Sequence, residues 1–167
     1  MPTLIRWSDG VAHEAPDSFV AVDDDEPMPP GDVIVNMTRF QAEGDRLIGE
    51  GRRVGVRVQP NEAVEVLAYD LPRIAVVALV FPKFRDGRAY SAAMLLRTRL
   101  AYAGEVRAVG EVLLEQARFM IRCGFDAFEP ADHTGAEDWD LAARRYRHVY
   151  QRAADTSSPA FQERAGA

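Results

Sequence analysis

The sequence is short of several residues on which whole classes of site depend. It contains one cysteine, Cys123, which excludes an internal disulfide, an iron–sulfur cluster or a cysteine-rich zinc site held by this chain alone. Its three histidines, His13, His133 and His148, lie in separate regions without the spacing of metal ligands, so we expect no metal site. Neither a glycine-rich dinucleotide fingerprint nor a phosphate-binding P-loop is present, and we expect no cofactor.

Long apolar runs and an excess of positive charge are also missing. No stretch approaches the roughly 20 apolar residues of a membrane helix, and the opening residues, MPTLIRWSDG, lack the apolar core of an export signal. The net charge of -6 and the pI near 5.1 argue against general binding to nucleic acid or to anionic membranes. We therefore expect a cytoplasmic protein with neither kind of partner.

Lysine is nearly absent, because 19 of the 20 basic residues are arginine. The exception, Lys83, falls in a predicted loop. An ammonium group is a compact point charge that can hold an oxyanion or change its pKa when it is desolvated. Lys83 is therefore a candidate functional residue, with chance retention in a surface loop as the alternative.

The most informative stretch that is present is the apolar run IAVVALVF, residues 74–81. Its eight apolar residues, many of them β-branched, predict a strand buried on both faces, as in parallel sheets. Pro82 ends the run, and four charged residues follow: Lys83, Arg85, Asp86 and Arg88. In α/β folds, ligands bind at the carboxyl ends of such strands.

Strand and helix patterns alternate from residue 32 onward. Strands are predicted over 33–36, 54–59, 74–81, 106–109 and 125–129, and helices over 39–50, 62–70, 88–102 and 111–123. Alternation with short connections predicts an α/β fold with sequential β-α repeats, a parallel sheet of about five strands and right-handed crossovers.

Shorter elements flank this repeat. A β-hairpin over 4–13 with Asp9-Gly10 as its turn, a possible strand over 19–22 and an acidic, proline-rich linker precede it, and a helix over 139–152 follows. We therefore divide the chain into an N-terminal hairpin and linker, 1–31, a single α/β domain, 32–152, and a mobile tail, 153–167.

Charged residues inside the predicted strands distinguish two architectures. Arg57, Arg107, Asp126 and Glu129 fall within strands, and a charge buried singly would cost several kcal/mol. They fit a barrel-like segment, with helices on one face and charged groups on the other, better than a flavodoxin-like sheet, which remains the alternative. A barrel segment leaves two edges and a concave face exposed, so we also expect a homo-oligomer.

The loop FPKFRDGR leads into a predicted helix N-terminus, where free backbone N–H groups and the helix dipole favour anions. Lys83, Arg85 and Arg88 add full positive charges, and Gly87 lets a backbone approach closely. A sulfate, sulfite, phosphate or carboxylate group would suit this place. In the alternative interpretation, the arginines pair with Asp86, Glu111 and Glu129 and only fasten loops.

A catalytic interpretation uses the same residues. Lys83 would act as a base or an electrostatic stabiliser, with Asp86, Glu111 or Glu129 as its carboxylate partner. Cys123 ends a predicted helix and is expected to be a small buried filler rather than a nucleophile.

Two segments, FPKFRDGRAYSAAMLLRTRL and VRAVGEVLLEQARFMIRCGFDAFE, resemble a bacterial family of unknown function. Its members are often labelled "oxidoreductase probably involved in sulfite reduction" and are encoded beside sulfite-reductase and sulfate-assimilation genes. The resemblance covers roughly residues 32–130, and many relatives have aspartate where this chain has Glu111. The family pattern carries onto Lys83, Arg85, Asp86, Gly87, Arg88, Tyr90, Ser91, Arg107, Gly110, Gln116, Cys123, Gly124, Asp126 and Glu129.

The resemblance implies a role in sulfur assimilation, but one cysteine cannot ligate the cluster that sulfite reduction normally uses. We therefore expect an accessory or binding protein that holds a sulfur oxyanion, an adenylylated sulfate or a partner reductase at the loop after the central strand. Its ligand-binding residues would be Lys83, Arg85, Gly87, Arg88, Ser91, Arg107 and Gly110. A small barrel-type enzyme and a purely structural scaffold are the alternatives.

Overall fold

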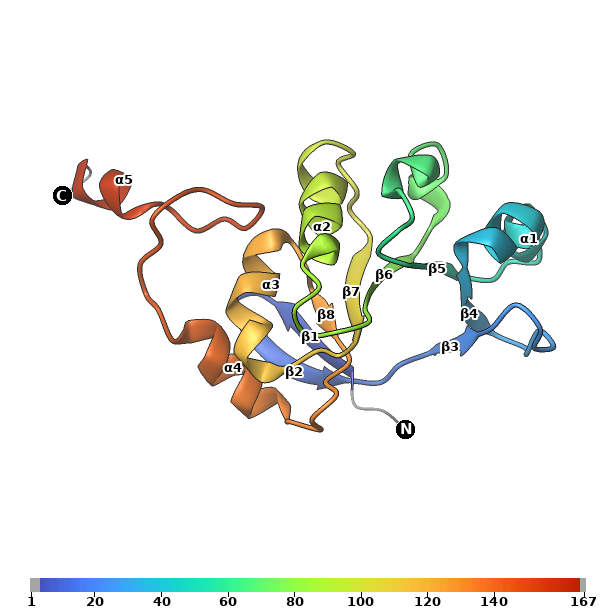
Figure 1. The fold of residues 1–167 in the computed structure, drawn as a ribbon, viewed down its shortest axis with the longest axis horizontal. Helices are drawn as coiled ribbons and strands as arrows, with labels where there is room; N and C mark the ends of the chain where they lie inside the picture. The colour runs from blue at the N-terminus through green and yellow to red at the C-terminus, as the bar shows by residue number, and fades with distance from the viewer. Residues whose placement is uncertain (1–3, 166–167) are drawn as a thin grey trace.

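The structure, a computed structural model, describes residues 4–165 and confirms the α/β class (Figure 1). All strands belong to one eight-stranded sheet in the order β2-β1-β8-β7-β6-β5-β4-β3. The strands are β1 (Leu4–Ser8), β2 (Val11–Ala15), β3 (Phe19–Val22), β4 (Asp32–Asn36), β5 (Val54–Val58), β6 (Val76–Phe81), β7 (Glu105–Gly110) and β8 (Ala127–Phe128).

The sheet is larger and more mixed in orientation than the sequence predicted. From β3 to β8, each strand pairs in parallel with the next strand along the chain. The hairpin β1–β2 then extends the sheet, because β1 is antiparallel to both β8 and β2. The prediction of about five parallel strands is therefore wrong, since the hairpin and β3 both join the sheet. Strand order that follows chain order also rules out the flavodoxin-like alternative, in which the order reverses.

Most of the helices are shorter than the sequence patterns indicated, although the first has 13 residues where the prediction over 39–50 has 12. The helices are α1 (Met37–Gly49), α2 (Arg88–Thr98), α3 (Ala117–Cys123), α4 (Ala136–Arg144) and α5 (Ala160–Ala165), with single 3₁₀ turns η1 (Val64–Leu67), η2 (Leu71–Arg73) and η3 (Leu114–Gln116).

The helix predicted over 62–70 is absent, and η1 and η2 take its place. The β-branched Val64 and Val66 disfavour a helix, and Pro72 cannot donate the hydrogen bond that would continue one. The helix predicted over 139–152 begins earlier, at Ala136, and ends at Arg144.

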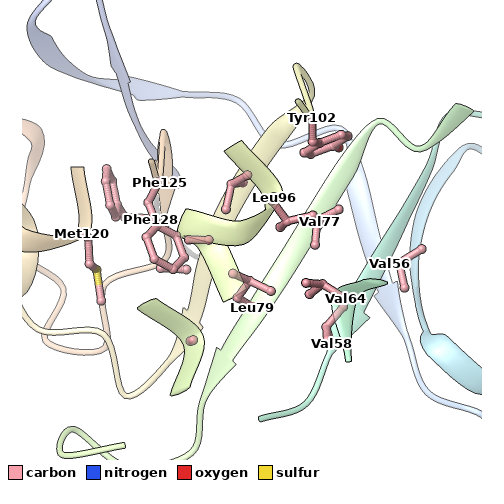
Figure 2. Packing of buried hydrophobic residues seen from close by; sticks show 14 of the residues in the cluster. Val56, Val58, Val64, Val77, Leu79, Leu96, Tyr102, Met120, Phe125 and Phe128 are labelled. Atoms are coloured by element: carbon pink, nitrogen blue, oxygen red, sulfur yellow. The ribbon is translucent and has the colours of Figure 1, made fainter. Parts of the chain in front are cut away.

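One face of the sheet carries the main core. Val77 and Leu79 point from it toward Leu96, and Met120 lies beside the Phe125 and Phe128 rings of the same cluster (Figure 2). Burial of this apolar face at about 25 cal/mol per Å² is the main favourable contribution to folding. The alternating residues of the same strands point to the other face.

The other face is charged and contacts no helix of the main core. A row of paired positions crosses it from strand to strand: Asn36, Arg57, Ala78, Arg107, Ala127 and Arg6. A small separate cluster, Phe19, Ile34, Val76 and Ala78, is buried there. Arg57 and Arg107, whose charges pointed to a face without helices, both lie in this row.

The link between β2 and β3 shows that the sheet curls around this second face. Asp17 bonds to Arg107 on β7, and Phe19, two residues later, begins β3. On a flat sheet β3 and β7 would lie about 19 Å apart, four strand spacings, whereas two residues span at most about 7 Å. The side chains of Asp17 and Arg107 span part of the difference, and the curl of the sheet brings β3 toward β7, so that the Arg107 guanidinium lies 5.9 Å from the centre of the Phe19 ring. Asp17 fastens the link over the concave side.

Candidate functional site

The loop between β6 and α2, residues 82–87, lies at the carboxyl edge of the parallel strands. Two side chains from the β7–α3 connection hold it at one point. The backbone N–H of Phe84 donates to Oε2 of Glu111 at 2.8 Å, and Nε2 of Gln116 donates to the carbonyl oxygen of Phe84 at 3.3 Å. The loop is thus fixed at Phe84, which positions the residues on either side.

Lys83 and Arg85 flank that fixed point and are both exposed. Within residues 4–165, neither side chain forms an ion pair or a hydrogen bond. Arg88 differs, because its Nε and Nη2 donate to Asp86 at 3.0 and 2.7 Å. The Arg88 guanidinium lowers the pKa of the Asp86 carboxyl to about 2, so this pair is ionised and internally neutralised. The uncompensated charge of the loop comes from Lys83 and Arg85.

The start of α2 is only partly available to a ligand. Gly87 is its N-cap, and the backbone N–H of Arg88 already donates to Oδ1 of Asp86 at 3.2 Å. A Cβ on Gly87 would have Tyr90 as its nearest neighbour at 3.9 Å, so the space beside the loop is open. Ser91 is exposed one turn further along α2.

Gly110 belongs to the framework of the site. Its φ is +96°, and a Cβ there would lie 2.4 Å from the carbonyl oxygen of Phe81. Only glycine allows this approach, which lets the N–H of Glu111 donate to the same oxygen at 2.8 Å. Gly110 therefore turns Glu111 toward Phe84, which gives it a conformational role in the site.

The structure separates Arg107 and Glu129 from the loop. Arg107 is fully buried on the helix-free face, where its Nη1 donates to Glu129 at 3.0 Å. Each candidate carboxylate thus has its own partner: Asp86 has Arg88, Glu111 has the Phe84 N–H, and Glu129 has Arg107. No hydrogen bond or ion pair joins any of them to Lys83 in the described range.

Tyr90, Gln116 and Phe119 pack beside the loop and contribute more to the site than the sequence indicated. Nε2 of Gln116 donates to the hydroxyl of Tyr90 at 3.0 Å, and the Tyr90 and Phe119 rings meet edge to face at 4.6 Å. Burial raises the pKa of Tyr90, so its hydroxyl stays neutral. Phe119 does not lie on the apolar face predicted for its helix. An aromatic residue on the polar face of a helix could have indicated an exposed apolar surface from the sequence alone.

Other candidate chemistry is weaker. Burial raises the pKa of the Cys123 thiol to about 11, so it is protonated and unreactive at neutral pH. Among residues 4–165, no three His, Cys, Asp or Glu side chains gather as metal ligands. In the same range no helix has the length and apolar character to cross a membrane.

Comparison with known proteins places the chain in a family. The family model described as "bacterial protein of unknown function (DUF934)" matches residues 55–161, which is more than half of the sequence. The chain belongs to this family. The resemblance noted from the two sequence segments is therefore confirmed, and the matched range contains the 82–87 loop, α2, α3 and α4. No curated protein matches the chain.

Proposed function

We propose that this protein is an accessory protein of sulfur assimilation that binds an oxyanion-bearing ligand at the 82–87 loop. The observation that carries the proposal is the state of Lys83 and Arg85. They are exposed and unpaired in the described part of the chain, beside a residue that is fixed at both its N–H and its carbonyl oxygen. The fixed backbone at Phe84 sets where both side chains start before a ligand arrives, so binding has to order the two side chains but not the loop backbone.

The partners of the carboxylates favour binding over catalysis. A general base must reach the proton that it removes, and a catalytic lysine needs a neighbour that perturbs it. Asp86, Glu111 and Glu129 are each engaged elsewhere, and Asp86 is held ionised by Arg88. Binding requires only the two free cations.

The proposed role in sulfur assimilation depends on the family resemblance. Members with the FPKFRDGRAYS and VGEVLLEQARF patterns carry the sulfite-reduction label, and the loop lies within the first of these segments. Sulfite, sulfate and adenosine phosphosulfates each present an oxyanion that an ammonium and a guanidinium can hold. A sulfite-reductase or sulfate-assimilation enzyme would be the protein to which the ligand passes, and self-association would not alter this role.

Isothermal titration calorimetry with sulfite, sulfate, phosphate and adenosine phosphosulfate tests the proposal. At least one anion should bind, and raising the salt concentration should weaken binding because the cations are exposed. Lys83→Ala and Arg85→Ala should each weaken it about tenfold, the usual worth of one charge-assisted hydrogen bond.

Arg46→Ala is the matched control, since Arg46 is an exposed arginine on α1. It removes the same charge far along the sheet and should leave affinity unchanged within about twofold. Absence of heat with every anion, or equal losses in the control and in the loop variants, would reject the proposed site.

A further inference from the structure

A second surface, which we call the arginine-rimmed groove, runs along α2 and α3 and under the segment 145–161. Its main hollow, about 580 Å³, shares Met94, Phe119 and Cys123 with a neighbouring hollow of about 390 Å³. At the other end it shares residues 150–152 with a third hollow of about 470 Å³. The three hollows are therefore neighbours along one surface and share part of their lining.

The floor and walls of the groove are apolar and exposed. Phe119 is 56% exposed, Tyr146 62%, Tyr150 91% and Phe161 63%. Isolated exposed apolar residues are ordinary, but a contiguous set that includes aromatic side chains marks an interaction surface. Aromatic residues are also the residues that most often dominate binding energy at interfaces.

The charge around the groove is opposite to that of the whole protein. The chain has 26 acidic and 20 basic residues, yet no aspartate or glutamate lines any of the three hollows. Five arginines do line them: Arg99, Arg118, Arg122, Arg152 and Arg164.

Not all of these cations are free. Arg122 pairs with Asp155, Arg118 donates to the carbonyl oxygen of Ala143, and His148 on the wall of the main hollow contacts Glu163. Arg99, Arg152 and Arg164 have no ion pair within the described residues and are exposed. Three positive charges at the rim of the groove therefore lack an ion-pair partner among residues 4–165.

The wall formed by the C-terminal segment stands away from the sheet (Figure 1). Its polar contacts with the rest of the domain converge on Arg122: the N–H of Ala154 donates to the Arg122 carbonyl oxygen at 3.0 Å, and the Arg122 guanidinium contacts Gln151 and Asp155. The bridge between Val149 and Pro159 lies within the segment itself. α5, beyond it, buries none of its residues. Such a wall can adjust to an occupant at low cost, because few contacts have to break.

We propose that the arginine-rimmed groove binds an acidic, amphipathic helix of a partner protein. The apolar floor fits the hydrophobic side of such a helix, and the unpaired Arg99, Arg152 and Arg164 fit acidic residues along its borders. A protein fits better than a nucleic acid, because aliphatic side chains such as Met94 and Val149 can pack against the apolar side of a helix but give no stacking surface for bases. The proposal does not depend on an oxyanion at the 82–87 loop.

Fluorescence anisotropy with the full chain and two designed peptides tests this inference. One fluorescein-labelled helical peptide carries leucine and phenylalanine on one side and glutamate on the other, and its twin carries lysine in place of glutamate. The acidic peptide should bind saturably and at least about tenfold more tightly than its twin. Equal affinities, or no binding of the acidic peptide, would overturn the proposal.

Variants locate the binding. Arg152→Glu and Phe119→Ser change exposed side chains, so folding is preserved, and each should weaken the acidic peptide by about tenfold or more. Arg46→Glu on α1 and Lys83→Ala in the loop should leave its affinity within about twofold, which separates this result from the oxyanion result. Unchanged affinity in Arg152→Glu would overturn the groove as the site.

Two other outcomes would assign the groove to a different occupant. A dimer that Phe119→Ser dissociates in light scattering would instead assign the groove to a second copy. Tighter binding of a thymidine oligonucleotide than of the peptide, lost in Arg152→Glu, would assign it to nucleic acid. Either result overturns the proposal.

Discussion

Replacement of Arg107 by methionine tests how the curled sheet is held closed. The side chain is 0% exposed, and the paired positions on both neighbouring strands are alanines, Ala78 and Ala127, which leave room for it. Methionine keeps much of the length and the apolar stem but removes the guanidinium. Burial opposes the charge, but the hydrogen bonds that Arg107 donates to Asp17 and Glu105 and the negative charges of these carboxylates outweigh it and raise the pKa of Arg107, which is therefore always protonated.

The expected loss of stability depends on the carboxylates that lose their partner when the guanidinium is removed. Its Nη1 donates to Asp17 at 2.6 Å and to Glu129 at 3.0 Å, and its Nε donates to Glu105 at 2.7 Å. Arg107→Met leaves these carboxylates close together without their shared cation. Removing one partner of a buried ion pair costs about 3–5 kcal/mol, a large part of the roughly 5–15 kcal/mol that stabilises a typical domain. The melting temperature should fall by about 6–20 °C, at about 2–4 °C per kcal/mol for this chain length.

Urea and thermal unfolding followed by circular dichroism measure the change. Arg46→Met is the control, because Arg46 forms its ion pairs on the exposed side of α1 and should contribute less than about 1 kcal/mol. Asp17→Asn should cost less than Arg107→Met, about 1–2 kcal/mol, because Arg107 keeps Glu105 and Glu129.

A double-mutant cycle completes the test. If Asp17 fastens the β2–β3 link through Arg107, the double variant should cost clearly less than the sum of the two single variants. A loss below about 1 kcal/mol for Arg107→Met, or full additivity with Asp17→Asn, would show that water screens these charges. The curled sheet would then need another explanation than this contact.

Three further changes test local features. Gly110→Ala should cost about 3 kcal/mol or more in urea denaturation, because left-handed backbone strain adds to a Cβ 2.4 Å from Phe81, whereas Gly51→Ala, with φ +81° and open space, should cost only about 1 kcal/mol. Cys123→Ala should remove a loss of stability at high pH. The folded-state pKa of about 11 lies above the unfolded value, so the wild type should lose about 2–3 kcal/mol relative to the variant as pH rises from about 8.5 to 11, and a constant difference would contradict this. Glu111→Ala frees the Phe84 N–H, so hydrogen exchange within residues 82–87 should speed up, while unchanged exchange would show that Glu111 does not hold the loop.

Local patterns made the fold class predictable. The apolar run at 74–81 lies almost entirely in β6, and Asp9 and Gly10 both take positive φ, as the two-residue turn of the predicted hairpin requires. Glycines after α1 and α3 mark the helix ends in the sequence, and Gly124 indeed adopts a left-handed conformation. Each of these features depends on residues that are close together in the chain.

Long-range pairing was not predictable in the same way. Strand β1 pairs with β8 at only two positions, Ile5 with Phe128 and Arg6 with Ala127. The sequence of the hairpin does not indicate with which strand of the sheet it pairs. Arg107 could be recognised as a charge inside a strand, but its partner Asp17 lies 90 residues away in a short connection. Without that partner, the family pattern alone placed Arg107 among the ligand-binding candidates, although its guanidinium is engaged inside the protein.

The candidate site shows the same limit at a smaller scale. Arg85 and Arg88 both flank Asp86 in the sequence, and either could have neutralised it. The carboxylate turns toward the start of α2, where it accepts from both the backbone and the side chain of Arg88, and it forms no hydrogen bond or ion pair with Arg85. Backbone geometry, rather than composition, therefore decides which cations remain free. For this reason only Lys83 and Arg85, of the three cations first considered, remain as proposed anion ligands. An Arg88→Ala variant should release the Asp86 carboxylate to interact with these two cations. It should therefore weaken anion binding although Arg88 does not itself touch the ligand.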